Sequence, residues 1–171
     1  MATVIRGDDN FDTSIGANVV QTHVTISSTQ ALAGNTVDVT GLTATITPKH
    51  STSKIMVEVR WCGESGASDH DLFMGMRRGG VDIGNPDAAG SRLVVMAAVP
   101  QGYHTDDRNS TPTTTSYSYL DSPLTTSPVT YTATMSTGST VTLYNNRTGH
   151  DSDGSGYERL TSSITLTEVQ G

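Results

Sequence analysis

The feature that most constrains the fold is a strict alternation of apolar and polar side chains between residues 41 and 61. Because successive side chains of a β-strand point to opposite faces, this period predicts two strands, each with one buried and one solvated face. We expect a β-hairpin closed by the polar connection at residues 48–53, with the chain's only tryptophan, Trp61, anchoring the core. The two apolar rows are Leu42, Ala44 and Ile46, then Ile55, Val57, Val59 and Trp61.

The same alternation recurs along most of the chain from residue 18 onward. Turn-forming residues separate the apolar rows about every ten positions, and no segment shows a helical period. About eight to ten short strands of this kind predict an all-β antiparallel sandwich or barrel, with a jelly-roll β-sandwich the preferred architecture and the last strand paired inside a sheet. The further inward rows are Val20, Val24 and Ile26; Val37 and Val39; Leu72, Met74 and Met76; Tyr117 and Tyr119; Val129, Tyr131, Ala133 and Met135; Val141 and Leu143; and Ile164 and Leu166.

One segment, residues 92–99, is apolar at nearly every position. A strand that is apolar on both faces is buried on both faces. This predicts either a deeply buried strand or a contact between subunits. We favour the contact, at Leu93, Val95, Ala97 and Val99, because only 34% of the residues are hydrophobic and a single subunit has a thin core.

Residues 1–17 carry no sustained alternation and precede the predicted sandwich at residues 18–171. They are either a frayed terminus or an anchoring arm. In the second interpretation Ile5 and Phe11 are hydrophobic plugs that insert into a neighbouring protein.

The overall charge and the single cysteine exclude several classes of partner. A net charge of −7 without a basic run disfavours nucleic acid and anionic membranes, because neutralising phosphates requires clustered cations. Cys62 is alone, so we expect a buried thiol and no disulfide framework. No apolar run approaches the roughly 18 residues of a membrane span, and no signal-peptide pattern is present, which predicts a soluble protein made in the cytoplasm.

Clusters of histidine and acid are the only candidates for chemistry. Asp151 and Asp153 lie in a run that resembles the start of a calcium loop, but the bidentate acid that would close such a loop is missing. We therefore expect solvated loop charges, with no metal and no cofactor. The absence of nucleophile-elbow, Walker and dinucleotide motifs predicts that the chain is not an enzyme. The clusters are Asp69-His70-Asp71, His104 with Asp106 and Asp107, and His150 with Asp151 and Asp153.

Several segments, in a fixed order, resemble small β-rich domains of tailed-bacteriophage virion proteins. The resemblance spans residues 18–171 and implies a homotrimeric jelly roll of the kind found at fibre tips and on capsid surfaces. It also implies exposed loops and attachment to a host surface or to the shell. The segments are TGLTATITPKHSTSKIMVEVRW at residues 40–61, residues 76–84, DAAGSR at 87–92, YLDSP at 119–123, Tyr131, Asn146-Arg147 and SSITLTEV at 162–169.

This resemblance predicts a virion structural protein and leaves two roles open. In a tail-fibre tip, the loops at residues 102–115 and 145–158 would meet a host receptor or surface glycan, exposing Tyr103, His104, His150 and Tyr157. In a capsid decoration protein, residues 1–17 and one flat face would meet other virion proteins of the shell. A carbohydrate-binding module is a third alternative, weakly supported because Tyr103 and Tyr157 are the only aromatic residues in these loops.

Overall fold

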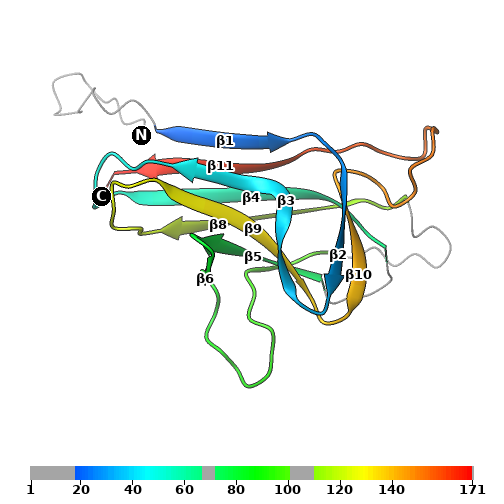
Figure 1. Cartoon of the computed structure of the whole chain (residues 1–171), viewed down its shortest axis with the longest axis horizontal. Helices are drawn as coiled ribbons and strands as arrows, with labels where there is room; N and C mark the ends of the chain where they lie inside the picture. Colours follow the sequence, from blue (N-terminus) through cyan, green and yellow to red (C-terminus); the bar gives the residue numbers. More distant parts are fainter. Residues whose placement is uncertain (1–17, 67–71, 101–109, 171) are drawn as a thin grey trace, which may run out of the picture.

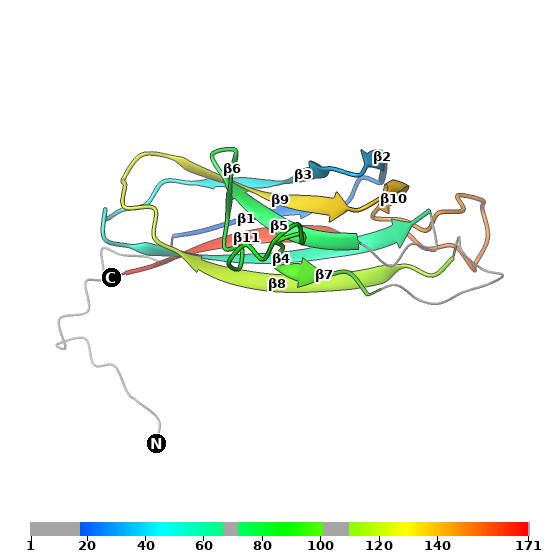
Figure 2. The ribbon, with the colours of Figure 1, turned by 90° about the horizontal axis from the view of Figure 1, so that it is seen from below.

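The computed structural model describes residues 18–66, 72–100 and 110–170, and these form strands, turns and irregular connections with no helix. Two antiparallel sheets pack face to face, as Figures 1 and 2 show from two directions. The prediction of an all-β antiparallel sandwich is confirmed. The described strands are β1 (Val19–Val24), β2 (Ser28–Ala33), β3 (Thr36–Ile46), β4 (Lys54–Ser65), β5 (Leu72–Arg78), β6 (Val81–Ile83), β7 (Ala97–Ala98), β8 (Thr113–Asp121), β9 (Val129–Thr137), β10 (Thr140–Asn145) and β11 (Ser162–Val169).

The six-stranded sheet is organised around β4. This strand pairs with β8 along one side, and with β11 and then β10 along the other. β1 pairs with β11, and β2 pairs with β10. The second sheet has the order β3-β9-β5-β6, with β7 also paired to β5. Because β11 lies between β1 and β4, the prediction that the last strand pairs inside a sheet is confirmed.

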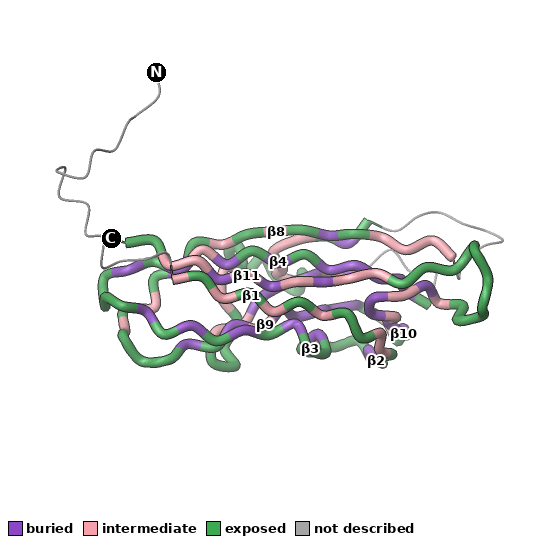
Figure 3. The backbone as a smooth tube through the Cα atoms, turned by 90° about the horizontal axis from the view of Figure 1, so that it is seen from above, coloured by how far each residue is buried: buried purple, intermediate pink, exposed green. Residues whose placement is uncertain are grey.

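The predicted hairpin at residues 41–61 is wrong, although both of its buried rows are right. β3 pairs with β9 in one sheet, whereas β4 belongs to the other. Leu42 and Ile46 therefore share one core with Trp61 from the opposite sheet. The alternation identified which face of each strand is buried, but it does not identify the neighbouring strand. Figure 3 shows buried and exposed residues alternating along the long strands.

A two-stranded ribbon passes from one sheet to the other at a corner. Ala33 pairs with Thr140 in the six-stranded sheet, and Thr36 pairs with Ser136 in the five-stranded sheet. At the corner, the Gly34 N–H donates to the Ser139 carbonyl over 3.1 Å. Gly34 has a φ of +68°, which a side chain would strain. The turn residues at this corner thus bend a paired ribbon between layers.

A polar cluster also joins the two sheets. Asp121 of β8 is buried and accepts hydrogen bonds at 2.8 and 3.0 Å from Arg78 of β5. The Tyr131 hydroxyl of β9 donates to the same carboxylate over 2.7 Å. Burial raises the pKa of Tyr131, and the hydrogen bond to Asp121 raises it further. An ion pair and a hydrogen bond from one sheet therefore converge on a carboxylate of the other.

Two expectations about individual apolar residues are resolved by the fold. Cys62 is fully buried, as predicted. Ile26, predicted to point inward, is 79% exposed because β1 ends at Val24, before the alternation would have placed Ile26 in the core.

The apolar segment at residues 93–99 is not a strand buried on both faces. Only Ala97–Ala98 forms a strand, β7, paired with Phe73 and Met74 of β5. Leu93 is 51% exposed, whereas Val99 is 4% exposed. A side chain at Gly84 would come within 2.8 Å of Met96, so the segment lies against its own subunit at that point. The segment packs along one side of the sandwich, where Val99 is covered and Leu93 remains exposed.

The long axis of the sandwich has two distinct poles. β1 begins and β11 ends at the same pole, because Val19 pairs with Thr167. We call this the proximal pole; it lies at the left of Figure 1. β11 begins at the opposite, distal pole, where Val24 pairs with Ser162. The connection at residues 146–161 occupies the distal pole, drawn in orange at the right of Figure 1.

Candidate functional site

Three strands meet at the distal pole. Gly63 of β4 pairs with Thr113 of β8 on one side and with Asn145 of β10 on the other. A Cβ at Gly63 would lie 2.3 Å from the Tyr144 carbonyl oxygen, so only glycine allows this approach. The close packing places the connection that precedes β8 beside the connection that follows β10.

Glu64 fastens these two connections together. Its side chain is buried, and Oε1 accepts hydrogen bonds from the Thr111 N–H (3.2 Å) and hydroxyl (3.0 Å). Oε2 accepts a third hydrogen bond from the Gly149 N–H over 2.7 Å. These three donors are two backbone N–H groups and one hydroxyl. A buried carboxylate requires hydrogen-bond donors, so Glu64 fixes the backbone of both connections relative to β4.

Two asparagines hold the base of the connection at residues 146–161. Asn145 Oδ1 accepts a hydrogen bond from Trp61 Nε1 over 2.8 Å, inside the core. Asn146 has a φ of +59°, a conformation that asparagine tolerates better than most residues. Its Nδ2 donates to the Ile26 carbonyl, and its Oδ1 accepts from the Ser162 hydroxyl. The connection therefore leaves the sheet from a fixed base.

Contacts of two arginines hold the outer part of the connection at residues 146–161. Arg147 Nη1 donates to the carbonyls of Thr148 and Gly149, both over 3.1 Å. The Arg147 guanidinium lies 4.6 Å from the centre of the Tyr144 ring, within range of a cation–π interaction. Asp151 forms ion pairs with Arg159 and, over 3.7 Å, with Arg147. The hydrogen bond from Arg159 lowers the pKa of Asp151.

The predicted site residues of this connection are exposed. The rings of His150 and Tyr157 stack with centroids 4.5 Å apart, so His150 covers one face of Tyr157. Asp153 is exposed, and Asp151 already has cationic partners. In the described part of the chain, no group of three or more His, Cys, Asp and Glu side chains is placed to hold a metal ion.

Several predicted residues lie outside the described residues. They are Ile5 and Phe11 of the arm, Tyr103 and His104, and the acid–histidine clusters at residues 69–71 and 104–107. Of the predicted trimer contact, Leu93 is exposed, Val95 and Ala97 are half-buried, and Val99 is buried. No partner chain is present, so that contact stays a prediction.

The proximal pole also has a fixed geometry. Glu168 of β11 accepts hydrogen bonds from Asn18 Nδ2 (2.7 Å) and from the N–H groups of Lys49 (2.8 Å) and His50 (3.3 Å). Burial raises the pKa of Glu168, but these hydrogen bonds outweigh it and the net pKa is lowered. Glu168 therefore joins Asn18 to the connection between β3 and β4.

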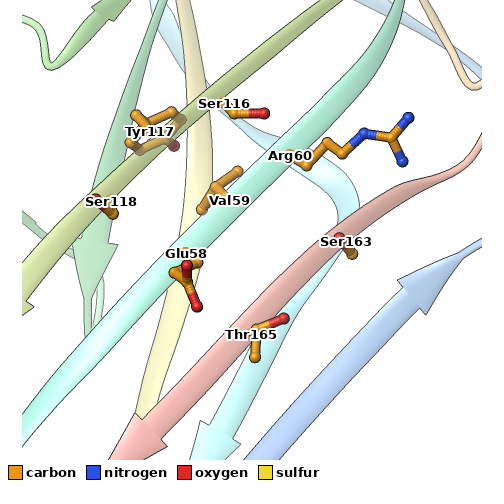
Figure 4. Close-up of a pocket in the computed structure, with 8 residues that line it drawn as sticks. All are labelled: Glu58, Val59, Arg60, Ser116, Tyr117, Ser118, Ser163 and Thr165. Carbon is orange, nitrogen blue, oxygen red and sulfur yellow. The ribbon is translucent and has the colours of Figure 1, made fainter. Parts of the chain in front are cut away.

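A shallow depression of about 400 Å³ lies on the outer face of the six-stranded sheet. Figure 4 shows Glu58 and Arg60 projecting from β4, with small hydroxyl side chains on the flanking strands β8 and β11. The depression has opposite charges over a floor lined mainly by hydroxyl groups. The lining residues are Glu58, Val59, Arg60, Ser116, Tyr117, Ser118, Ser163 and Thr165.

Sequence reasoning missed Glu64, Asn145 and Asn146 as organisers of the distal pole. The sequence carries no local signal for Glu64: the alternation of β4 stops after Trp61, and only the structure shows that every residue from Trp61 to Ser65 is buried.

No protein-family model matches the sequence, and no match was found among curated proteins. No helix in the described part of the chain is long and apolar enough to cross a membrane.

Proposed function

We propose that this chain is a structural protein of a bacteriophage virion. In this proposal it is a homotrimeric jelly-roll sandwich, attached to the particle through residues 1–17 and presenting its distal pole to a host receptor or surface glycan. The observation that carries the proposal is the separation of the two poles. The chain enters the sandwich at Asn18 on the proximal pole, and the longest described connection, residues 146–161, lies on the distal pole.

The construction of the distal pole supports a binding role. Glu64, Asn146 and Arg147 fix the backbone of the connection, while the His150–Tyr157 pair remains outside. A loop that is ordered before binding loses less conformational entropy when it meets a partner. A stacked, amphipathic aromatic pair on such a loop is a suitable contact group for a receptor surface.

Competition for host attachment tests this proposal. We expect the purified full chain to slow adsorption of phage particles that carry it, because both compete for the same receptor. Tyr157→Ser and His150→Ser should weaken the competition at least several-fold. His50→Ser is the matched control, since His50 is exposed at the proximal pole, and it should compete like the parent chain. Competition that is absent, or unaffected by the distal variants, would contradict the receptor role.

Removal of residues 1–17 tests the attachment end. The truncated chain should fold and form the same oligomer but should not be incorporated into particles. Truncated chain recovered in particles at the parent level would refute the anchoring arm.

Capsid decoration is the second candidate, favoured by the broad outer face that β1, β11, β4 and β8 form on the six-stranded sheet. In that role the face and residues 1–17 would lie on the shell. Quantitative mass spectrometry of purified particles separates the roles: a copy number that scales with the number of capsid subunits indicates decoration, and a few trimers per particle indicate a tail tip.

A further inference from the structure

We infer that a second copy of this chain packs on the outer face formed by β1, β11, β4 and β8. The inference rests on the homotrimer in the proposed function and names a surface through which its subunits meet. The strand registers define the face, because residues paired across neighbouring strands project to the same side.

The outer face consists of three rows that run across the four strands. Burial agrees with the registers: Glu58, Arg60 and Ser118 are exposed, while Val57 and Val59 between them are buried. From the proximal end the rows are Val19, Thr167, Met56 and Leu120; then Gln21, Thr165, Glu58 and Ser118; then His23, Ser163, Arg60 and Ser116.

The first row is apolar in three of its four strands. Val19 is 50% exposed and Leu120 is 41% exposed, with Met56 half-buried between them on β4. In a single subunit this row leaves apolar surface in water on an otherwise hydroxyl-rich face. Covering it removes apolar surface from water, which is favourable.

The charge of the face suits a copy of the same chain. The whole chain carries a net charge of −7, so two copies repel each other over most approaches. The three rows contain one carboxylate, Glu58, and one guanidinium, Arg60, which cancel. This face therefore adds no net negative charge to a contact between acidic subunits.

The three rows make up part of a subunit interface. Rows two residues apart lie about 6.8 Å apart along the strands, so three rows on four strands at about 4.8 Å spacing cover about 20 Å by about 19 Å. The product is about 400 Å² on this partner, or about 800 Å² in total, so surface beside the rows must join a contact that reaches the roughly 1,000 Å² of a stable interface. The depression in Figure 4 provides space for protruding side chains of the neighbour.

A threefold ring requires a second, different patch to meet this face. We assign it to the segment before β7, where the Leu93 side chain is 51% exposed. The Leu93 segment of one subunit would then lie on the outer face of the next. This arrangement retains the predicted subunit contact at Leu93 and proposes the outer face as the surface that Leu93 contacts on the neighbouring subunit.

A matched pair of leucine variants tests the inference by sedimentation equilibrium of the full chain. The parent should have three times the 18.0 kDa mass of one chain. Leu120→Asp should reduce it to a single chain, because it places a carboxylate in the apolar row. Leu124→Asp should keep the parent mass, because Leu124 is 74% exposed outside the three rows. Far-UV circular dichroism checks that both variants are folded.

A second variant and the remaining outcomes keep the inference refutable. Ser118→Arg fills the depression from an exposed position and should also dissociate the trimer. A trimer that persists in both Leu120→Asp and Ser118→Arg overturns the inference but leaves the homotrimer intact. Dissociation by Leu93→Asp alone would place the contact in the Leu93 segment without this face. A monomeric parent overturns both the inference and the homotrimer, and leaves the face free for a shell protein.

Discussion

Replacing Glu64 by glutamine should destabilise the protein by about 2 kcal/mol, with the effect centred on the distal pole. The carboxylate accepts three hydrogen bonds from Thr111 and Gly149 in a buried position. Glutamine keeps one oxygen as an acceptor but replaces the other by an NH₂ group, which cannot accept a hydrogen bond from Thr111 or Gly149. One buried donor then loses its acceptor, which costs about 1–3 kcal/mol.

The assay is urea unfolding of parent and variant at one protein concentration, because association contributes to apparent stability. Amide hydrogen exchange of Gly149 reports on the distal connection and should accelerate more than exchange in β9. Glu158→Gln is the matched control: Glu158 is exposed in the same connection, and its change should stay within about 0.5 kcal/mol. Equal stabilities of Glu64→Gln and Glu158→Gln would refute the role of Glu64.

Three further predictions address the core and its pH dependence. Tyr131→Phe should cost about 2 kcal/mol in denaturant unfolding, because it removes a buried hydrogen bond to the Asp121 carboxylate; a cost below about 0.5 kcal/mol would show that the bond is not needed. Burial raises the pKa of Tyr117 and of Tyr131 above the unfolded value of about 10, so the unfolded chain releases these protons first. The contribution of these two tyrosines should be constant below about pH 10, and stability should fall as the pH rises further, with a shallower fall in Tyr117→Phe; a flat alkaline profile would contradict this assignment. Gly63→Ala should cost about 3 kcal/mol or prevent folding, since the new Cβ would lie 2.3 Å from the Tyr144 carbonyl oxygen, and a parent-like melting temperature would refute this packing.

The sequence predicts which face of each strand is buried, but it does not predict which strands pair with each other. Alternation placed Leu42, Ile46 and Trp61 in the core, because a β-strand has only two faces. It could not decide whether residues 48–53 close a hairpin or carry the chain across the core, since both connections are short and polar. The same limit applies at Gly34, where turn residues bend a paired ribbon between the sheets.

Composition was also ambiguous for the apolar segment at residues 93–99. A uniformly apolar run fits a strand buried on both faces, and it equally fits an irregular segment packed against the side of a sandwich. Tertiary contacts decide between them: Met96 lies against Gly84, and the segment joins β5 through the short strand Ala97–Ala98 and the backbone hydrogen bonds beside it. Those contacts depend on residues distant in sequence, which no local pattern contains.

The candidate site was predictable only in its exposed part. The loop composition indicated His150 and Tyr157, and both are exposed at the distal pole. Glu64 and Asn146 were not identified from the sequence, because a charged or amide residue near a strand end resembles a solvated one until its hydrogen-bond partners are known. The outer face of β4 was visible as the polar half of its alternation, but the row that includes Leu120 requires the strand registers.

The orientation of the sandwich on the virus particle tests the central claim most directly. Electron cryo-microscopy of particles that carry the chain should place Asn18 and the proximal pole toward the particle, with residues 146–161 outermost on a threefold axis. A sandwich lying with its outer β1–β11–β4–β8 face on the shell, or standing with its distal pole inward, would contradict the account.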